Sequence, residues 1–201
     1  MNYLAHIFLA RQSDAAMIGA MLGDFAKANI HGQYTPEIER EIMLHRYIDS
    51  YTDSHPVVKS SVRLFEGPRR RYAGIVLDVL YDHLLTQRWS AYSELPRHEL
   101  IARFHSALSA HMDILPDKLR DIAPRIIAQN WLASYEDIGG VEMAVTRISQ
   151  RLSRNGHLMR ECLDDMRVHH DAIADGFERF FPDLIRYSEE RRAELISGQG
   201  A

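Results

Sequence analysis

The spacing of the apolar residues constrains this chain most strongly, because they recur at three- and four-residue intervals almost throughout. No stretch of four to eight residues alternates cleanly between apolar and polar types between turn signals, as a half-buried strand would. The 201 residues contain no internal repeat and no long polar linker. The sequence therefore predicts one all-α domain, a single helical bundle over residues 1–196. Residues 197–201, which include two glycines, are expected to form a flexible tail.

Local signals predict where individual helices begin and end. Thr35 followed by Pro36 is typical of a helix start, and the apolar spacing continues that helix to about residue 54. The segment from about residue 72 to 89 is the most apolar, which predicts a helix crossing the middle of the domain. Other helices are expected, separated by prolines and glycines, over 13–22, 57–65, 99–112, 117–132, 141–152 and 158–180, with a short terminal helix after Pro182.

Composition narrows the classes of function. Against 28 acidic residues there are 24 Lys and Arg, a net charge of −4 that argues against bulk nucleic-acid binding. The single Cys162 excludes an intramolecular disulfide and a cysteine-based zinc site. The apolar start has no basic leader and is interrupted by charges, so we expect a cytoplasmic protein that contacts no membrane. The 11 histidines point to metal binding or acid–base chemistry.

Polar residues interrupt apolar helical surroundings in the first half of the chain. His6 lies among apolar residues, and Asp24 lies near the end of an apolar helix, where an unpaired charge would be costly. His45, Asp49 and Asp53 follow one another at four-residue steps, which puts them on one helix face. Each also has a structural explanation: a core histidine, an acid near a helix terminus, or surface ion pairs.

A third cluster, Asp78, Asp82 and His83, lies in the most apolar predicted helix. Two carboxylates on a buried helix repel each other unless a cation, a base or a shared proton relieves them; the alternative is a solvent stripe paired to arginines. Together the three clusters offer many oxygens, a few imidazoles and no thiolate, which suits Mn²⁺, Mg²⁺ or iron better than structural zinc. They predict a metal-dependent hydrolase of a phosphate ester.

The same residues carry a family resemblance. The motifs are Asn-aromatic-Leu-Ala-His at 2–6, Asp-Phe at 24–25, His-Arg-x-Ile-Asp-x-x-Thr-Asp at 45–53, and Leu-Asp-x-x-x-Asp-His at 77–83 followed by Trp89. In order and spacing the chain resembles the acyl carrier protein phosphodiesterases, a divergent branch of the HD phosphohydrolases. The later half agrees more weakly, through Trp131, Tyr135 and Arg151. The resemblance implies an HD-like helical fold, Mn²⁺ as the usual metal, and hydrolysis of 4′-phosphopantetheine from holo-acyl carrier protein.

Roles within the site also come from the resemblance. The implied metal ligands are Asp24, His45 and Asp82, followed by His6 and Asp78. The implied catalytic residues are Asp24 together with Asp49 or His83, either of which would orient a ligand or relay a proton. One departure stands out, because Gly23-Asp24 occupies the place where HD proteins show a His-Asp dipeptide.

Acyl carrier protein is small and acidic, so its hydrolase should present basic residues beside the active site. Arg69, Arg70 and Arg71 precede the helix of the third cluster and are the predicted partner-binding residues. The helix dipole disfavours cations there, which favours a role in binding over a simple solvated loop. Two other functions stay open: an HD-like phosphohydrolase of a small nucleotide or phosphate ester, and a non-catalytic helical protein that binds an acidic partner.

Overall fold

The computed structural model describes residues 1–198, and every regular element within that range is a helix. The all-α prediction is confirmed. The α-helices are α1 (Tyr3–Leu9), α2 (Asp14–Leu22), α3 (Pro36–Ser54), α4 (Pro56–Arg63), α5 (Ala73–Gln87), α6 (Trp89–Tyr92), α7 (Arg97–Ala110), α8 (Asp117–Ala128), α9 (Ile138–Gln150), α10 (Gly156–Val168) and α11 (His170–Gly198). Short 3₁₀ helices are η1 (Gly67–Tyr72), η2 (Met112–Ile114) and η3 (Ala133–Glu136).

Helix starts follow the capping signals in the sequence. Ser13 Oγ accepts a hydrogen bond from the Ala16 N–H at 2.9 Å and begins α2. Thr35 Oγ1 accepts one from the Ile38 N–H at 3.5 Å, with Pro36 at the first position of α3. These side chains satisfy backbone donors that have no partner within the helix. The predicted start of α3 is thereby confirmed.

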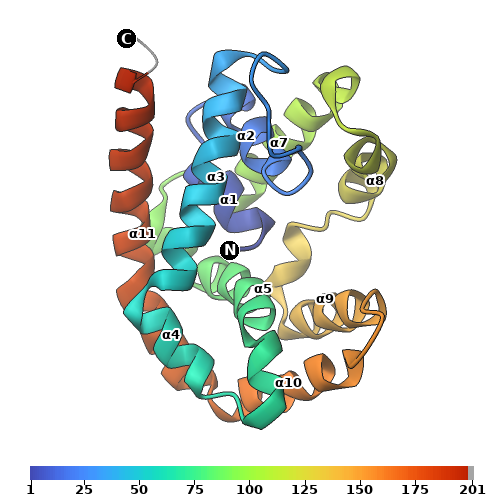
Figure 1. Cartoon of the computed structure of the whole chain (residues 1–201), viewed down its shortest axis with the longest axis vertical. Coiled ribbons are helices and arrows are strands. Elements are labelled where there is room, and N and C mark those ends of the chain that lie inside the picture. Colours follow the sequence, from blue (N-terminus) through green and yellow to red (C-terminus); the bar gives the residue numbers. More distant parts are fainter. Residues whose placement is uncertain (199–201) are drawn as a thin grey trace.

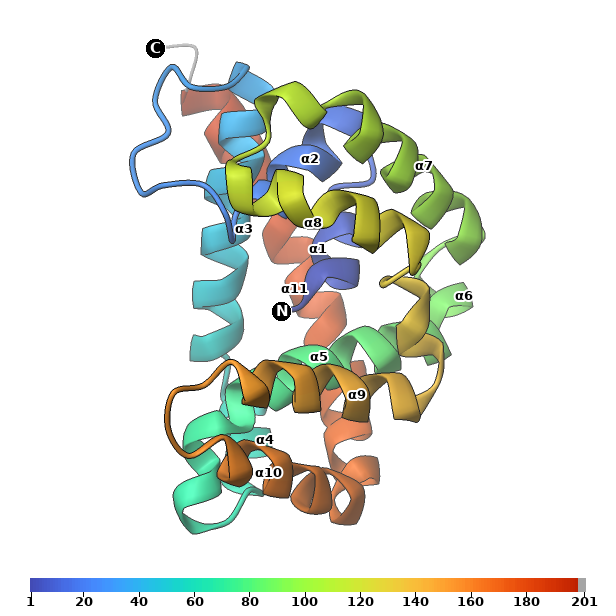
Figure 2. The same cartoon turned by 90° about the vertical axis from the view of Figure 1, so that its right-hand side faces the viewer.

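The core lies where α1, α2, α3, α5 and α11 meet. Figure 1 shows α3 and α4 alongside the long α11, while α9 and α10 cover the other flank of α5. Helix α5 is buried on most sides, as its apolar composition predicts. In the view turned by 90°, α8 lies above the N-terminus and α9 lies below it (Figure 2). Within residues 1–198, no helix has both the length and the hydropathy needed to cross a bilayer.

The C-terminal region differs from the sequence prediction. The helix expected over 158–180 breaks at His169, and α11 then continues through Pro182 to Gly198. A proline inside a helix costs about 3 kcal/mol. Phe180, Phe181 and Leu184 beside it are fully buried, each worth roughly 2 kcal/mol, so packing outweighs the proline. The last part of the predicted tail, residues 199–201, lies outside the described residues.

A buried ion pair joins α11 to α3. Arg192 Nε lies 2.9 Å from Glu41 Oε1, and Arg192 Nη2 lies 3.1 Å from Glu41 Oε2. Nη2 also donates to the Leu9 carbonyl at 2.7 Å. The Glu41 side chain is only 1% exposed. One guanidinium therefore joins α11 to α3 and to the end of α1.

Candidate metal centre

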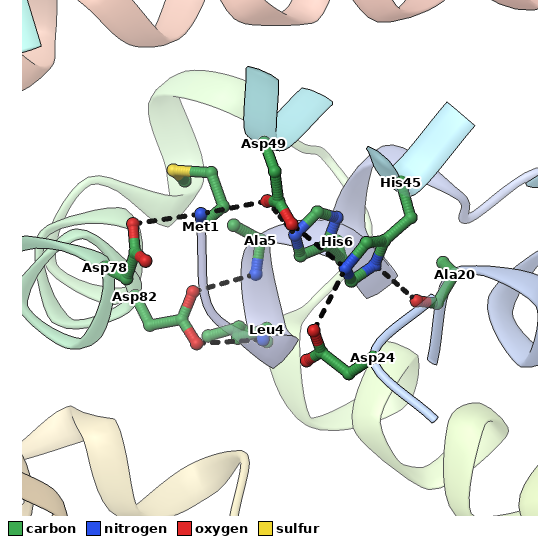
Figure 3. A network of polar contacts seen from close by, with 10 residues as sticks. All are labelled: Met1, Leu4, Ala5, His6, Ala20, Asp24, His45, Asp49, Asp78 and Asp82. Atoms are coloured by element: carbon green, nitrogen blue, oxygen red, sulfur yellow. Dashed lines mark hydrogen bonds and ion pairs between the residues drawn. The ribbon is translucent and has the colours of Figure 1, made fainter. Parts of the chain in front are cut away.

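Three segments bring the polar centre together. His6 comes from α1, His45 and Asp49 lie one turn apart on α3, and Asp24 follows α2 (Figure 3). One nitrogen of each imidazole and one oxygen of Asp49 lie within 4.8 Å of one another. No other group of three such donors is this close within the part of the chain that the structure describes. His45 and Asp49 share one face of α3, and they become part of a group of three donors because α1 places His6 beside them.

The two imidazoles stack on each other. Their ring centroids are 3.7 Å apart, with an interplanar angle of 12°. Burial, aided by the charge of His45, lowers the pKa of His6 to about 4. His6 is therefore neutral near pH 7, and the stack does not join two cations. Its Nε2 lies 3.0 Å from Asp49 Oδ1, whereas its Nδ1 is buried without a hydrogen-bond partner.

His45 is held at both ring nitrogens. Nδ1 lies 2.7 Å from the carbonyl oxygen of Ala20, so this nitrogen carries the proton and donates. Nε2 faces two carboxylates, at 3.2 Å from Asp49 Oδ2 and 3.4 Å from Asp24 Oδ1. Burial works to lower the pKa of His45, but these carboxylates outweigh it and raise the pKa to about 9. Nε2 therefore carries a proton near pH 7 in the metal-free protein.

The carboxylates of Asp49 and Asp24 stay ionised. Burial works to raise the pKa of both groups, and the neighbouring histidines more than offset it, so both pKa values lie below the usual range. The α-amino group of Met1 is also 3.2 Å from Asp49 Oδ1. Asp24 has 49% of its side chain exposed and so forms the solvent side of the cluster.

Gly23 is a site residue that sequence reasoning treated only as a departure from the HD pattern. A Cβ at this position would lie 2.1 to 2.5 Å from three atoms of the His45 ring. Its φ of −50° is open to any residue, so the requirement for glycine comes from the close approach and not from the backbone conformation. The dipeptide Gly23-Asp24 gives no signal of this contact, because His45 lies far away in the sequence.

The carboxylates of α5 hold the start of the chain. Asp82 is fully buried, and its two oxygens accept hydrogen bonds from the Leu4 and Ala5 N–H groups, both at 2.9 Å. Burial raises the pKa of Asp82 to about 7 despite these two donors. Asp78 Oδ1 lies 2.9 Å from the Met1 amine. Both residues fix the first turn of α1, and with it the position of His6.

His83 and Asp53 lie apart from this cluster. The Nδ1 of His83 is 2.7 Å from the Tyr135 carbonyl oxygen, and the side chain lines a separate cavity against α11. Asp53 is exposed one turn beyond Asp49. Of the residues singled out in the sequence, the structure therefore brings together His6, Asp24, His45 and Asp49.

The three consecutive arginines of η1 have different surroundings. Arg69 pairs with the buried Asp165 at 3.1 Å and with Glu66 at 3.0 Å. The Arg70 Nε donates to the Phe65 carbonyl at 3.1 Å. Arg71 is exposed and makes no hydrogen bond or ion pair within residues 1–198. Only Arg71 of the three has its full donor capacity available for a partner.

Fold and site together define an all-α protein whose polar centre is a stacked histidine pair with carboxylates from separate segments. The family model described as "Acyl carrier protein phosphodiesterase" matches residues 1–184. The chain belongs to the acyl carrier protein phosphodiesterase family of enzymes, as its motifs indicate.

Curated relatives align over nearly the whole chain. The acyl carrier protein phosphodiesterase of Photorhabdus laumondii is 31% identical over 194 residues, covering 95% of this chain and 96% of that protein. The protein of the same name from Klebsiella pneumoniae is 31% identical over 193 residues, covering 96% of this chain and all of that protein. No solved structure matches the chain. The HD-like character of the fold therefore stays a prediction.

Proposed function

We propose that the protein hydrolyses the phosphodiester that joins 4′-phosphopantetheine to a serine of holo-acyl carrier protein, and that it does so with a divalent metal ion. Mn²⁺ is the first choice, with Mg²⁺ or Fe²⁺ as alternatives. The observation that carries the proposal is the meeting of two imidazoles and Asp49 within 4.8 Å, beside the ionised Asp24. The names of the relatives, acyl carrier protein phosphodiesterases, support the choice of substrate.

The chemistry of the donor set fits such an ion. Imidazole nitrogens and carboxylate oxygens without a thiolate suit Mn²⁺, Fe²⁺ or Mg²⁺. His45 donates through Nδ1 to the Ala20 carbonyl, which is the usual arrangement of a metal-bound histidine because it presents the other nitrogen to the ion. We assign His6, His45, Asp49 and Asp24 as the residues that would hold the metal. Asp82 and Asp78 would act through α1, because their oxygens bind the Leu4 and Ala5 amides and the Met1 amine.

When bound, the ion would supply Lewis acidity toward the phosphoryl oxygens and make a water molecule more acidic. In the hydrolysis, the water oxygen forms a bond to phosphorus while the bond from phosphorus to the serine oxygen breaks. Asp24 is the proposed acceptor of the water proton, because it is ionised and faces solvent. The proton passes to the serine oxygen, giving apo-carrier and free 4′-phosphopantetheine.

Exposed cations on the protein would attract the acidic carrier. Arg71 has no polar partner within residues 1–198, whereas Arg69 neutralises Asp165. We expect Arg71→Ala to slow holo-carrier cleavage at low salt and to have little effect at high salt, because exposed charges are screened. The same variant with unchanged rates at both salt concentrations would remove Arg71 from the partner surface.

The direct test is incubation of purified protein with holo-acyl carrier protein and Mn²⁺, followed by the mass of the carrier. Loss of the phosphopantetheine mass, prevented by a chelator and by Asp24→Ala, is the expected result. Turnover of small phosphodiesters without carrier cleavage would favour the small-ester alternative. Binding of the carrier without hydrolysis under any metal would favour the non-catalytic alternative.

A further inference from the structure

A cavity of about 500 Å³ lies beside the polar centre. It falls within the roughly 300–1,000 Å³ range of small-molecule sites. Its walls come from α9, Ile122 of α8, the segment 129–135, and Asn2, Tyr3 and Phe25. Phe25 follows Asp24 directly in the chain, so the cavity wall includes the residue next to the polar cluster.

Tyr3 connects the cavity to the cluster. Burial raises its pKa to about 12, with the charge of Asp24 adding to this effect and the charge of Arg151 opposing it. Tyr3 lines the cavity together with Arg151, and its ring stacks on that of Phe25 with the centroids 6.4 Å apart. Because Phe25 follows Asp24 in the chain, we place the phosphodiester at this end of the cavity.

One face of α9 lines the cavity along its length. The lining residues of α9 and its C-terminal cap are Gly140, Met143, Ala144, Arg147, Ile148 and Arg151, at three- and four-residue spacing. At 1.5 Å per residue, the stripe from Gly140 to Arg151 is about 16 Å long. A phosphopantetheine arm has 13 chain atoms from its ester oxygen to its sulfur, joined by 12 bonds, and it extends to about 14 Å if three bonds span about 3.4 Å, as in a peptide. The part of the stripe from Met143 to Arg151 is about 12 Å long. An extended arm with its phosphate at Arg151 therefore reaches Met143.

The two ends of the stripe differ in chemistry. Arg147 and Arg151 form no ion pair within residues 1–198 and give one end two free positive charges. Toward the other end, Met143 and Ala144 give the stripe an apolar surface, and Trp131 also lines the cavity. The polar side chains of Asn2, Gln129 and Ser134 line it as well and are hydrogen-bonded to Tyr135 or Trp131. A ligand with a phosphate at one end and an uncharged thiol at the other matches the charged and apolar parts of the stripe.

We propose that this cavity binds the pantetheine arm of the substrate, extended along α9 with its phosphate toward Arg147 and Arg151 and its thiol toward Met143. The inference rests on the proposed function for the identity of the arm. The arm is thereby recognised over its whole length by this chain, and the carrier protein itself need only dock at the arginine end.

Disulfide trapping tests where the thiol lies, without any hydrolysis. Holo-carrier whose arm carries a pyridyl disulfide is mixed with chelator-treated Met143→Cys, and the new thiol displaces pyridine thione, which is followed by absorbance. Each rate is divided by the rate with small dithiodipyridine to remove intrinsic reactivity. Val168→Cys, at a 77% exposed position of α10 outside the cavity, is the matched control. Wild type gives the background, because its Cys162 is buried.

We expect the normalised rate to be at least tenfold higher for Met143→Cys than for Val168→Cys. Equal ratios would overturn the inference. A second variant, Ala144→Phe, narrows the cavity and should raise KM for holo-carrier about tenfold, whereas Val168→Phe should not; folding is checked by thermal unfolding. If wild type fails to cleave holo-carrier, the proposed function alone is contradicted, since trapping needs no catalysis. If wild type cleaves holo-carrier but the trapping ratios are equal and Ala144→Phe leaves KM unchanged, the inference alone is contradicted.

Discussion

The ring of His45 lies against the backbone of Gly23, so closely that a Cβ there would come within 2.5 Å of three ring atoms. The same ring stacks on His6 and is tied to the Ala20 carbonyl. These three contacts therefore fix the position of the ring. The space beside Gly23 is thus the place into which the histidine of another helix packs.

Replacing Gly23 by alanine should displace His45 and weaken metal binding. We expect Gly23→Ala to lower the affinity for Mn²⁺ at least tenfold, the scale seen when the groups that orient metal ligands are lost. Titration calorimetry measures this. The control is Gly74→Ala, where a Cβ meets no heavy atom within 4 Å, and which should bind Mn²⁺ like wild type. Equal affinity in the two variants would contradict the packing role of Gly23.

Asp49 and Asp53 provide a matched pair on one helix. Asp49 lies within the group of three donors, while Asp53 is exposed one turn further along α3. We expect Asp49→Asn to lose Mn²⁺ binding and carrier cleavage together, and Asp53→Asn to keep both within twofold. Metal content after gel filtration, with activity on the same samples, decides this. Retained metal in Asp49→Asn would remove that residue from the ligand set.

The stability of the metal-free protein should depend on pH through His45. Its pKa rises from 6.5 when unfolded to about 9 when folded. The folded state therefore holds this proton more tightly, and the stabilisation is full below pH 6.5 and lost as pH rises through 9. Urea unfolding in chelator should show a decrease on the order of 1 to 3 kcal/mol over that range. The decrease should be smaller in His45→Gln, where the Met1 amine remains, whose pKa, against the effect of burial, is raised to about 10 by Asp78 and Asp49; the same slope in both proteins would assign the titration elsewhere.

The Glu41–Arg192 pair should contribute strongly to stability. Arg192→Met removes the nearest cation from the buried Glu41 carboxylate, leaving Gln12 Nε2 at 3.3 Å and Arg40 Nε at 3.7 Å, and should cost up to about 3–5 kcal/mol. Arg186→Met breaks an exposed pair on the same helix and should leave the midpoint nearly unchanged. Denaturant midpoints of the two variants give the comparison. A loss below about 1 kcal/mol in Arg192→Met would show that α11 is held by apolar packing alone.

Much of the helical layout follows from the sequence, because capping and apolar spacing act within a few residues. Thr35 and Pro36 begin α3 as predicted, and α5 spans the expected apolar segment. The helix end predicted at Pro182 is wrong. A rule based on neighbouring residues cannot compare the free-energy cost of a proline in a helix with the stabilisation from the buried Phe180 and Phe181. Tertiary packing decided the length of α11.

For the site, sequence spacing predicts only which residues share a face of the same helix. The four-residue step from His45 to Asp49 correctly placed them on one face. Spacing cannot say which helices meet, so it could not show that His6 stacks on His45. Nor could spacing show that the two oxygens of Asp82 accept hydrogen bonds from the Leu4 and Ala5 N–H groups of α1. Both relationships depend on chain segments far apart in the sequence.

The most direct test of the metal centre is anomalous diffraction from crystals of this protein grown with Mn²⁺, with data collected above and below the manganese edge. The structure predicts an anomalous peak within bonding distance of one nitrogen each of His6 and His45 and of the Asp49 carboxylate. The same peak should be absent from crystals of Asp49→Asn. A manganese peak at Asp82 or Asp78 instead, with none between His6 and His45, would contradict this account.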